Sequence, residues 1–214
     1  MMTRMIHYIA QNSDKFMNAV FEHIVFLVII PVSIATLISL PLGIICSRHR
    51  KIGRIIMNIV SILQTIPSLA LLAFMITIGL GIGFKPAITA LVIYSLLPIT
   101  RNVYLGLTGI DRSIVEAARG MGFDSRQLLF KVEIPLAVPV ILGGIRTAAV
   151  TCIGTGVLAA YIGAGGLGTF IVTGLSQVRS YIIMAGALPA TVLAVITDFF
   201  LARLEKHLTP RGIR

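Results

Sequence analysis

Five long apolar runs, separated by short charged segments, dominate this sequence. Each run is close to the ~20 residues that a helix needs to cross the hydrocarbon core of a bilayer. Charged residues make up only 12% of the 214 residues, against about 25% in a soluble domain. We therefore expect an all-α integral membrane protein with one membrane domain and no sizeable soluble domain. The five expected spans are residues 24–46, 55–78, 86–107, 135–162 and 182–204.

Each of the five expected spans contains at least one proline in its interior. A proline within a membrane helix usually kinks it and frees a carbonyl group that must find another partner. Kinked helices suit a bundle that lines a path or moves, although kinked structural helices are also common. The prolines within the runs are Pro31, Pro41, Pro67, Pro98, Pro139 and Pro189.

The basic residues of the loops predict how the chain is oriented. One set of loops carries Arg48, Arg50, Lys51, Arg54, Arg101, Arg112, Arg119, Arg126, Lys131, Arg203, Lys206, Arg211 and Arg214, and the other set carries only Arg4, Lys15, Lys85 and Arg179. Because basic loops stay in the cytoplasm, we expect the N-terminus outside and the C-terminus inside. This asymmetry also accounts for the formal net charge of +10 without a nucleic-acid partner; membrane lipid is the expected surrounding.

These expectations divide the chain into three parts. Residues 1–23 form an extracytoplasmic N-terminal segment, residues 24–207 form the membrane domain, and residues 208–214 form a cytoplasmic tail. Within the membrane domain, a charged cytoplasmic loop occupies about residues 110–134. Such a charged loop in a membrane chain suggests that a soluble protein docks there.

The first half of this loop predicts a short capped helix. Ser113 and Glu116 have the spacing of a capping box, so the helix should start near Ile114. Gly122 suits a left-handed residue that ends it. Small residues on one face would let another protein approach closely. An amphipathic loop resting on lipid headgroups is the alternative interpretation.

The second half of the loop predicts another short helix over residues 126–132. Asp124 or Ser125 can cap its start. Pro135 then stands where the next membrane helix is expected to begin, which is a favoured position for proline. The expected outcome is a helix-turn-helix unit that precedes the fourth span.

The same loop resembles the EAA motif of bacterial ABC importer permeases. The motif residues are Glu116, Ala117, Ala118, Gly122, Val132, Ile134 and Pro135. The family form has Ile and Leu where this chain has Val132 and Ile134. Residues 64–68, 94–101 and 162–168 resemble the permeases of osmoprotectant systems for glycine betaine, carnitine or choline, and methionine-type permeases are a more distant likeness. The resemblance covers about residues 20–210.

This resemblance implies a type I ABC importer fold, like that of the methionine permease, in the bacterial cytoplasmic membrane. It implies a second permease subunit, identical or paralogous, two cytoplasmic ATPase subunits and an extracytoplasmic binding protein. Glu116, Ala117, Ala118, Gly122 and Pro135 would belong to the loop that couples to the ATPase. The implied cargo is a quaternary ammonium osmoprotectant; methionine and ergothioneine are the alternatives.

A glycine-rich stretch follows the fourth expected span. Gly163, Gly165 and Gly168 match the dinucleotide fingerprint in spacing, but neither a preceding strand nor a well-placed acidic residue accompanies them. We instead expect Gly163, Gly165, Gly166 and Gly168 to form a tight turn at an outer gate, within an outer loop over residues 161–180 that holds a short or re-entrant helix. Glycines at 79, 81 and 83 are likewise expected to form a turn rather than a helix-packing face.

Two charged residues fall inside expected spans. Arg146 lies in the fourth run and Asp198 in the fifth, and charges inside a membrane are costly unless they face protein or water. Their opposite signs and similar depth predict an ion pair across the two helices. Snorkelling of each side chain to the headgroups is the alternative.

The sequence offers no sign of an enzyme. It lacks the phosphate-binding loop of an ATPase, so ATP hydrolysis would fall to a partner subunit. Cys46 and Cys152 lie in separate apolar runs and are expected to be inert thiols, and the four histidines are scattered. We therefore expect no cofactor and no metal. A non-transporting membrane anchor and a self-sufficient secondary transporter are the rival functions.

Overall fold

The protein is described here by a computed structural model in which residues 1–209 are placed, and those residues form helices joined by short turns. The elements are α1 (Met2–Gln11), α2 (Ser13–Ile24), η1 (Val25–Ile29), α3 (Ile30–Arg48), α4 (Arg50–Thr65), α5 (Ser68–Met75), η2 (Ile76–Leu80), α6 (Phe84–Thr108), α7 (Arg112–Gly120), α8 (Ser125–Leu128), η3 (Leu129–Glu133), α9 (Ile134–Gly156), η4 (Val157–Ile162), α10 (Gly168–Ser176) and α11 (Ser180–Leu208). The expected tail falls mostly on residues 210–214, outside the described part.

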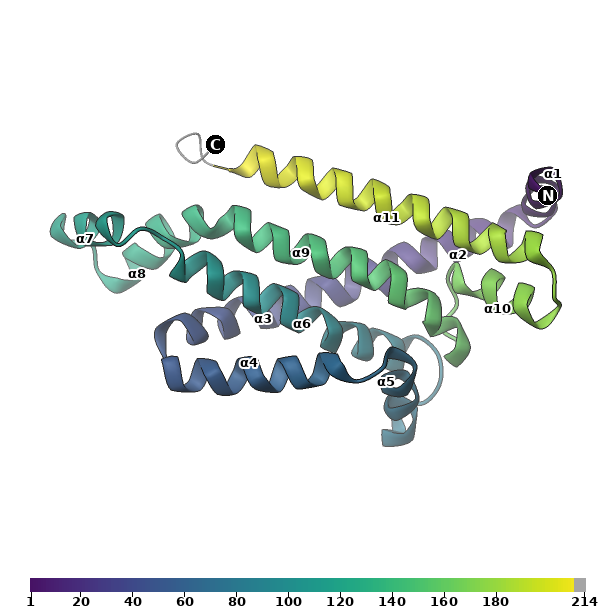
Figure 1. The fold of residues 1–214 in the computed structure, drawn as a ribbon, viewed down its shortest axis with the longest axis horizontal. Coiled ribbons are helices and arrows are strands. Elements are labelled where there is room, and N and C mark those ends of the chain that lie inside the picture. Colours follow the sequence, from purple (N-terminus) through teal and green to yellow (C-terminus); the bar gives the residue numbers. More distant parts are fainter. Residues whose placement is uncertain (210–214) are drawn as a thin grey trace.

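Four continuous helices within residues 1–209 are long and apolar enough to cross a membrane: Ser13–Arg48, Phe84–Thr108, Ser125–Ile162 and Ser180–Leu208. They run lengthwise along the molecule, with α7 and α8 at one end and α10 and the N-terminus at the other (Figure 1). We call these the α7 end and the α10 end. The first and third of these helices contain 36 and 38 residues, so at 1.5 Å per residue they exceed the ~30 Å hydrocarbon core and must tilt or protrude from it.

The expected second span is not one straight helix. Helices α4 and α5 meet at a bend of 98°, so this part of the chain is a broken span or a re-entrant hairpin. Ile66 and Pro67 are extended at the bend, because proline disfavours helical geometry in the residue before it. The carbonyl of Ile66 accepts a hydrogen bond from the Tyr94 hydroxyl on α6, which satisfies a group that lipid would leave unpaired.

Prolines also explain two π-helical turns inside the long helices. Pro31 follows η1 and Pro135 follows η3. Proline has no backbone N–H and its ring clashes with the carbonyl four residues earlier. In both places the helix widens, and the N–H of the preceding residue, Ile30 or Ile134, reaches the carbonyl five residues back. Each long helix therefore continues through its proline instead of ending there.

Helices α3, α6 and α9 form the centre of the bundle and approach closely at glycines. A Cβ atom added at Gly43 would lie 2.4 Å from the Val103 side chain, and one at Gly144 would lie 2.6 Å from Asn102 Cβ. Small residues allow this contact between membrane helices, where van der Waals packing replaces the hydrophobic effect as the main attraction. The same core includes the buried residues Ala35, Ile99, Val103, Ala137, Ile141 and Ala148.

The N-terminal segment, residues 1–23, for which no secondary structure was predicted, is helical. Helix α1 packs on the α10 end through Tyr8, whose ring lies 6.3 Å from that of Phe170 and 5.8 Å from that of Tyr181. Phe16 of α2 adds a further edge-to-face contact with Phe170 at 5.8 Å. This cluster ties the start of the chain to the turn between α10 and α11.

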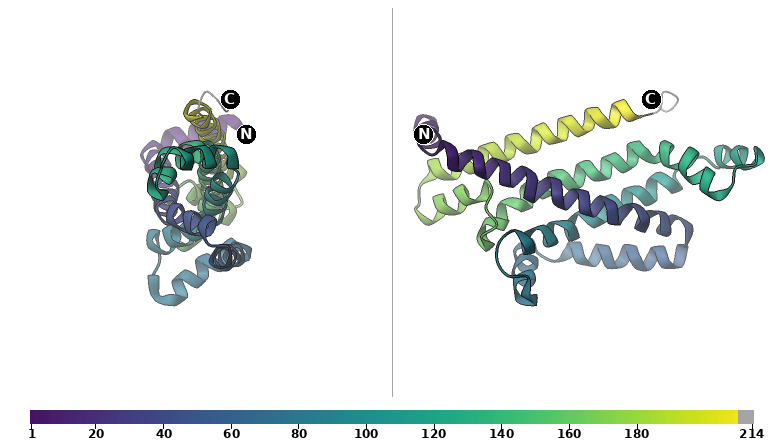
Figure 2. Two further views of the ribbon diagram at one scale, coloured as in Figure 1. Left: turned by 90° about the vertical axis from the view of Figure 1, so that its left-hand side faces the viewer. Right: turned by 180° about the vertical axis from the view of Figure 1, so that it is seen from behind.

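The first span crosses the bundle obliquely. Seen from behind, the helix Ser13–Arg48 runs from the α10 end to the α7 end across the other long helices (Figure 2, right). At the α7 end it turns sharply at His49, which is extended, and α4 begins. The first span therefore touches both ends of the molecule.

Candidate functional site

The charged loop forms a capped helix, α7, but its cap differs from the expected one. The N-cap is Asp111, whose carboxylate accepts a hydrogen bond from the Ser113 backbone N–H at 2.9 Å. The predicted Ser113–Glu116 capping box is therefore wrong, because the helix starts at Arg112, two residues before the expected start at Ile114. The bond from the Ser113 N–H lowers the pKa of Asp111, so the cap contributes stability at neutral pH and loses it as the pH falls through that lowered pKa.

Gly122 ends α7 in the left-handed conformation that the sequence predicts, with φ of 85°. The Phe123 N–H donates to the Ala118 carbonyl at 3.2 Å and the Gly122 N–H donates to Arg119 at 2.9 Å. This pair of bonds defines a Schellman motif, which satisfies carbonyls that the helix end would leave free. Both ends of α7 are therefore fixed by specific hydrogen bonds.

The second short helix has its own cap but is not a separate helix. Asp124 accepts hydrogen bonds from the N–H groups of Arg126 and Gln127, both at 2.8 Å, and Gln127 Oε1 accepts from the Asp124 N–H at 3.1 Å. Helix α8 then continues through η3 into α9, so the fourth span starts at Ser125 and not at Pro135. Whatever moves α8 consequently moves the span itself.

We call residues 111–128 the α7–α8 segment. The expected motif residues all lie in or just after it. Glu116 and Ala117 are exposed, Ala118 is buried on the inner side, and Pro135 is exposed near the start of α9. Ile114 and Met121 are 42% and 71% exposed and lie about two helical turns apart. The segment thus presents small and apolar side chains outward from a rigid backbone.

A basic cleft of about 450 Å³ lies beside α7. Its charged and aromatic lining consists of Arg48, Arg50, Tyr104, Arg112, Glu116 and Arg119. Guanidinium groups bind carboxylates and phosphates through paired hydrogen bonds. The α7 end therefore combines an outward apolar strip with a basic recess, which suits a partner surface that is partly acidic.

One ion pair joins the first span to the start of the fourth span, just after the α7–α8 segment. Both terminal guanidinium nitrogens of Arg48, at the end of α3, donate to the carboxylate of Glu133 in η3, and the distance from Nη1 to Oε1 is 3.2 Å. Glu133 has a side chain only 6% exposed. A buried carboxylate is costly without a partner, so Arg48 and Glu133 are expected to stay together.

Arg146 and Asp198 lie in contact across α9 and α11. Arg146 Nε and Nη2 donate to the two carboxylate oxygens of Asp198 at 2.5 and 2.7 Å. Glu205, one heptad beyond Asp198 on α11, places an oxygen 3.7 Å from Arg146 Nη1. The arginine thus stands between two carboxylates, one of which the sequence analysis did not consider.

The glycines at the α10 end form the expected tight turn. Gly163, Gly165 and Gly166 have φ of 74°, 69° and 73°, values that glycine adopts far more readily than other residues. Gly168 is needed for a different reason, since an added Cβ would lie 2.0 Å from the Val157 carbonyl oxygen. The short helix α10 follows. We call residues 162–168 the glycine loop.

The glycine loop and the turn before α6 are joined. The Gly83 N–H donates to the Ile162 carbonyl at 2.8 Å. Gly79, Gly81 and Gly83 all have positive φ, so this segment is a turn and not a helix-packing face, as expected. Within residues 1–209 no cluster of three or more His, Cys, Asp or Glu side chains could hold a metal ion.

Sequence reasoning missed the partners that hold these sites. Asp111 caps α7, Glu133 joins the start of the fourth span to Arg48, and Glu205 joins the Arg146 cluster. The spacing of Asp198 and Glu205, which puts both on one helix face, could have revealed the third of these. The pairing of Glu133 with Arg48, 85 residues away, had no signal in the sequence.

The fold and the α7–α8 segment together define a membrane permease component of a transport system. Residues 39–211 match the family model described as binding-protein-dependent transport system inner membrane component. The chain belongs to this family. It is an ABC importer permease subunit of a bacterial inner membrane, and its fold is that of the type I importers.

Curated relatives match along the whole length. The chain is 43% identical to a carnitine transport permease protein of Listeria monocytogenes, over 100% of this chain and 97% of the relative. It is 44% identical to an osmoprotectant import permease protein of Salmonella typhimurium, over 98% and 99%. A choline transport system permease protein of Bacillus subtilis is 41% identical, over 100% and 97%.

A solved structure shows the same fold. The inward-facing MetNI methionine ABC transporter matches with a TM-score of 0.81 and 24% identity, covering 91% of this chain and 96% of that chain. The methionine-permease-like fold expected from the resemblance is therefore confirmed.

Proposed function

We propose that this chain imports a quaternary ammonium osmoprotectant such as glycine betaine, carnitine or choline, driven by cytoplasmic ATPase subunits. The observation that carries the proposal is the α7–α8 segment, a doubly capped unit that runs directly into the fourth span. A rigid unit transmits displacement as a body. The partner ATPase would bind there, with Glu116, Ala117, Ala118 and Gly122 at the contact.

The basic cleft beside α7 supports an ATPase partner in preference to a loop that rests on lipid. Helix α7 is fixed at both ends, and its outward face combines apolar side chains with small ones. A lipid-resting helix would need no such recess or small residues. A second permease subunit completes the pathway, and an extracytoplasmic binding protein delivers the cargo at the glycine loop.

The cargo is inferred from relatives. Those named above transport carnitine, choline or osmoprotectants. The solved methionine transporter shares only the fold, so a methionine cargo has weaker support, as does ergothioneine. Aromatic rings recognise quaternary ammonium groups. The fold does bring Tyr8, Phe16, Phe170 and Tyr181 together, but these rings contact one another edge to face and are not an open cage.

Transport itself requires no covalent chemistry in this chain. The permease pair alternates between two conformations, and ATP binding favours one of them through different contacts in the two states. The α7–α8 segment carries movement of the ATPase pair into α9. The glycine loop at the far end of the same span then opens or closes the path.

Reconstitution tests the proposed function. We expect vesicles that contain the permease, its ATPase and its binding protein to accumulate radiolabelled glycine betaine, carnitine or choline in the presence of ATP. Binding-protein affinity for methionine and ergothioneine, measured by calorimetry, is expected to be at least about a hundredfold weaker, a difference of ~2.7 kcal/mol. Uptake that persists without the ATPase would contradict the proposal in favour of a secondary transporter.

The proposed orientation places the α7 end in the cytoplasm, with residues 1–23 outside. In a variant without native cysteines, Lys85→Cys is expected to react with a membrane-impermeant maleimide added to intact cells, and Arg50→Cys only after permeabilisation. The physical reason is that the translocation machinery retains basic loops inside. The reverse labelling pattern would refute this orientation.

A further inference from the structure

The first span holds the glycine loop through Glu22. The Gly166 N–H donates to Glu22 Oε2 at 2.9 Å, across 144 residues of sequence. The loop is shaped for this contact, because a Cβ atom at Gly165 would lie 2.3 Å from the same carboxylate oxygen. Glycine is thus required at 165 for its positive φ and for the room that Glu22 occupies. Glu22 therefore binds a backbone N–H group of the loop, and not a side chain.

His23, the next residue, enters the same region from the first span. It is fully buried, and its Nε2 lies 3.1 Å from the Ile153 carbonyl of α9. Because a carbonyl only accepts, Nε2 carries the proton. Nδ1 has no hydrogen-bond partner in the described structure, and a Cβ at Gly166 would lie 3.0 Å from it. His23 therefore wedges between α9 and the glycine loop.

The other end of the same helix is fixed to the fourth span. Arg48 binds the nearly buried Glu133 there, next to the α7–α8 segment. We call the contacts of Glu22 and His23 the outer clasp and the Arg48–Glu133 ion pair the inner clasp. Each clasp adjoins a π-helical turn that precedes a proline: His23 lies two residues before η1, and Glu133 is the last residue of η3. Such turns are often found at functional sites in helices.

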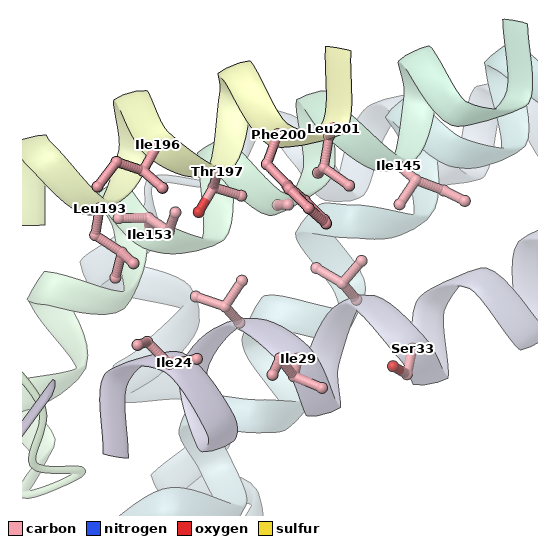
Figure 3. Close-up of a pocket in the computed structure, with 13 residues that line it drawn as sticks. Ile24, Ile29, Ser33, Ile145, Ile153, Leu193, Ile196, Thr197, Phe200 and Leu201 are labelled. Atoms are coloured by element: carbon pink, nitrogen blue, oxygen red, sulfur yellow. The ribbon is translucent and has the colours of Figure 1, made fainter. Parts of the chain in front are cut away.

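Between the two clasps the contact is apolar. Among residues 1–209, the polar side-chain contacts that join the first span to the fourth span or the glycine loop are those at Glu22, His23 and Arg48. Midway, a groove of about 400 Å³ separates the first span from α9 and α11, and Figure 3 shows its lining, with Ile24 and Ile29 facing Leu193 and Phe200. The first span is also held along its length by α6, since Gly43 lies against Val103 and the Ser39 hydroxyl donates to the Leu96 carbonyl at 3.3 Å. The polar contacts at its two ends therefore act on a helix that is already packed in the bundle.

We propose that Glu22 and His23 are positioning residues of the outer gate. We propose further that helix Ser13–Arg48 acts as a rigid rod, which couples movement of the α7–α8 segment to the glycine loop. This inference rests on the proposed function of the α7–α8 segment. Movement of that segment shifts Glu133, Glu133 carries Arg48, and the hydrogen-bonded helix transmits the shift along its axis to Glu22. The first span thereby transmits movement to the glycine loop alongside the fourth span, which runs directly into that loop.

Hydrogen–deuterium exchange of the purified permease tests the outer clasp without the ATPase. Glu22→Ala is expected to speed exchange in a peptide that covers residues 163–169 by about tenfold or more, because the Gly166 N–H loses a charged acceptor. Glu22→Gln keeps an acceptor oxygen and is expected to restore much of the protection. Asp14→Ala, which removes an exposed carboxylate from the same helix, is the matched control and should leave this peptide unchanged.

The inner clasp tests the rod. Arg48→Gln is expected to speed exchange in the same glycine-loop peptide, although the substitution lies at the opposite end of the molecule. The exchanged pair, Arg48→Glu with Glu133→Arg, is expected to restore it, which a general loss of folding would not allow. Unchanged exchange at the loop in Arg48→Gln would overturn the rod.

Transport by the reconstituted complex completes the test. Glu22→Ala and Arg48→Gln are expected to reduce import by about tenfold per ATP hydrolysed while leaving the KM for the loaded binding protein unchanged. Normal import by both variants would overturn the proposal. Import that does not need the ATPase would instead overturn the proposed function, so the two failures have different signatures.

Discussion

Gly122→Asp is expected to reduce import by the reconstituted complex about tenfold or more, while the subunit still inserts and folds. A Cβ atom at Gly122 meets no atom of this chain within 4 Å, so the new side chain enters open space in the isolated subunit. Any steric or electrostatic conflict must therefore come from a partner. Uptake and ATP hydrolysis, measured together in vesicles, should show hydrolysis continuing without import.

Gly122→Asn separates this docking effect from backbone strain. Asn and Asp both tolerate the left-handed conformation better than other non-glycine residues, so the φ of 85° affects the two variants alike. They differ in charge. We expect Asn to retain much more import than Asp, and equal import by Asp and wild type would remove Gly122 from the docking surface.

The second large effect concerns folding. Gly144→Leu is expected to destabilise the subunit by about 3 kcal/mol or more, because overpacking a tight contact forces helices apart. The added Cβ would lie 2.6 Å from Asn102 Cβ and 2.8 Å from the Pro98 carbonyl oxygen, and backbone atoms of α6 cannot move aside cheaply. Loss of the monodisperse protein on heating in detergent, followed by fluorescence-detected chromatography, measures this effect.

The neighbouring glycine provides the control. Gly143 lies on the same helix, and a Cβ there meets nothing within 4 Å. Gly143→Leu is therefore expected to leave the melting temperature nearly unchanged. If Gly143→Leu and Gly144→Leu destabilised the protein equally, helix propensity or insertion would explain the loss, and not the contact between α6 and α9.

Spans were predictable because membrane length and hydropathy are local properties. The first, third, fourth and fifth runs all became long helices, each of which extends beyond at least one of its expected ends. The ends were missed because helices outside the bilayer core need no apolar residues: α2 begins at Ser13, in a polar stretch, and the fourth span begins at Ser125 behind an Asp124 cap. The break at Pro67 was visible as a proline, but neither its 98° angle nor the hydrogen bond from Tyr94 to the Ile66 carbonyl there had a local signal in the sequence.

The candidate site likewise has features that the local sequence predicts and features that it does not. Gly122 was predictable from local chemistry, since a glycine after a helical stretch suits a left-handed stop. The start of α7 was not, because Asp111 and Ser113 compete for the cap and both have suitable side chains. The Arg146–Asp198 contact followed from opposite charges at similar depth. The Arg48–Glu133 and Glu22–Gly166 contacts depend on how the first span crosses the bundle, which no local pattern encodes.

The two clasps have a consequence for engineering chimaeras. Residues 13–48 and 125–168 are far apart in the gene, yet they meet at Glu22 with Gly166 and at Arg48 with Glu133. Exchanging the first span alone between related permeases would pair one parent's Arg48 and Glu22 with the other parent's residues at positions 133 and 166. These two segments therefore form one unit of recombination, and a functional hybrid should inherit both from the same parent.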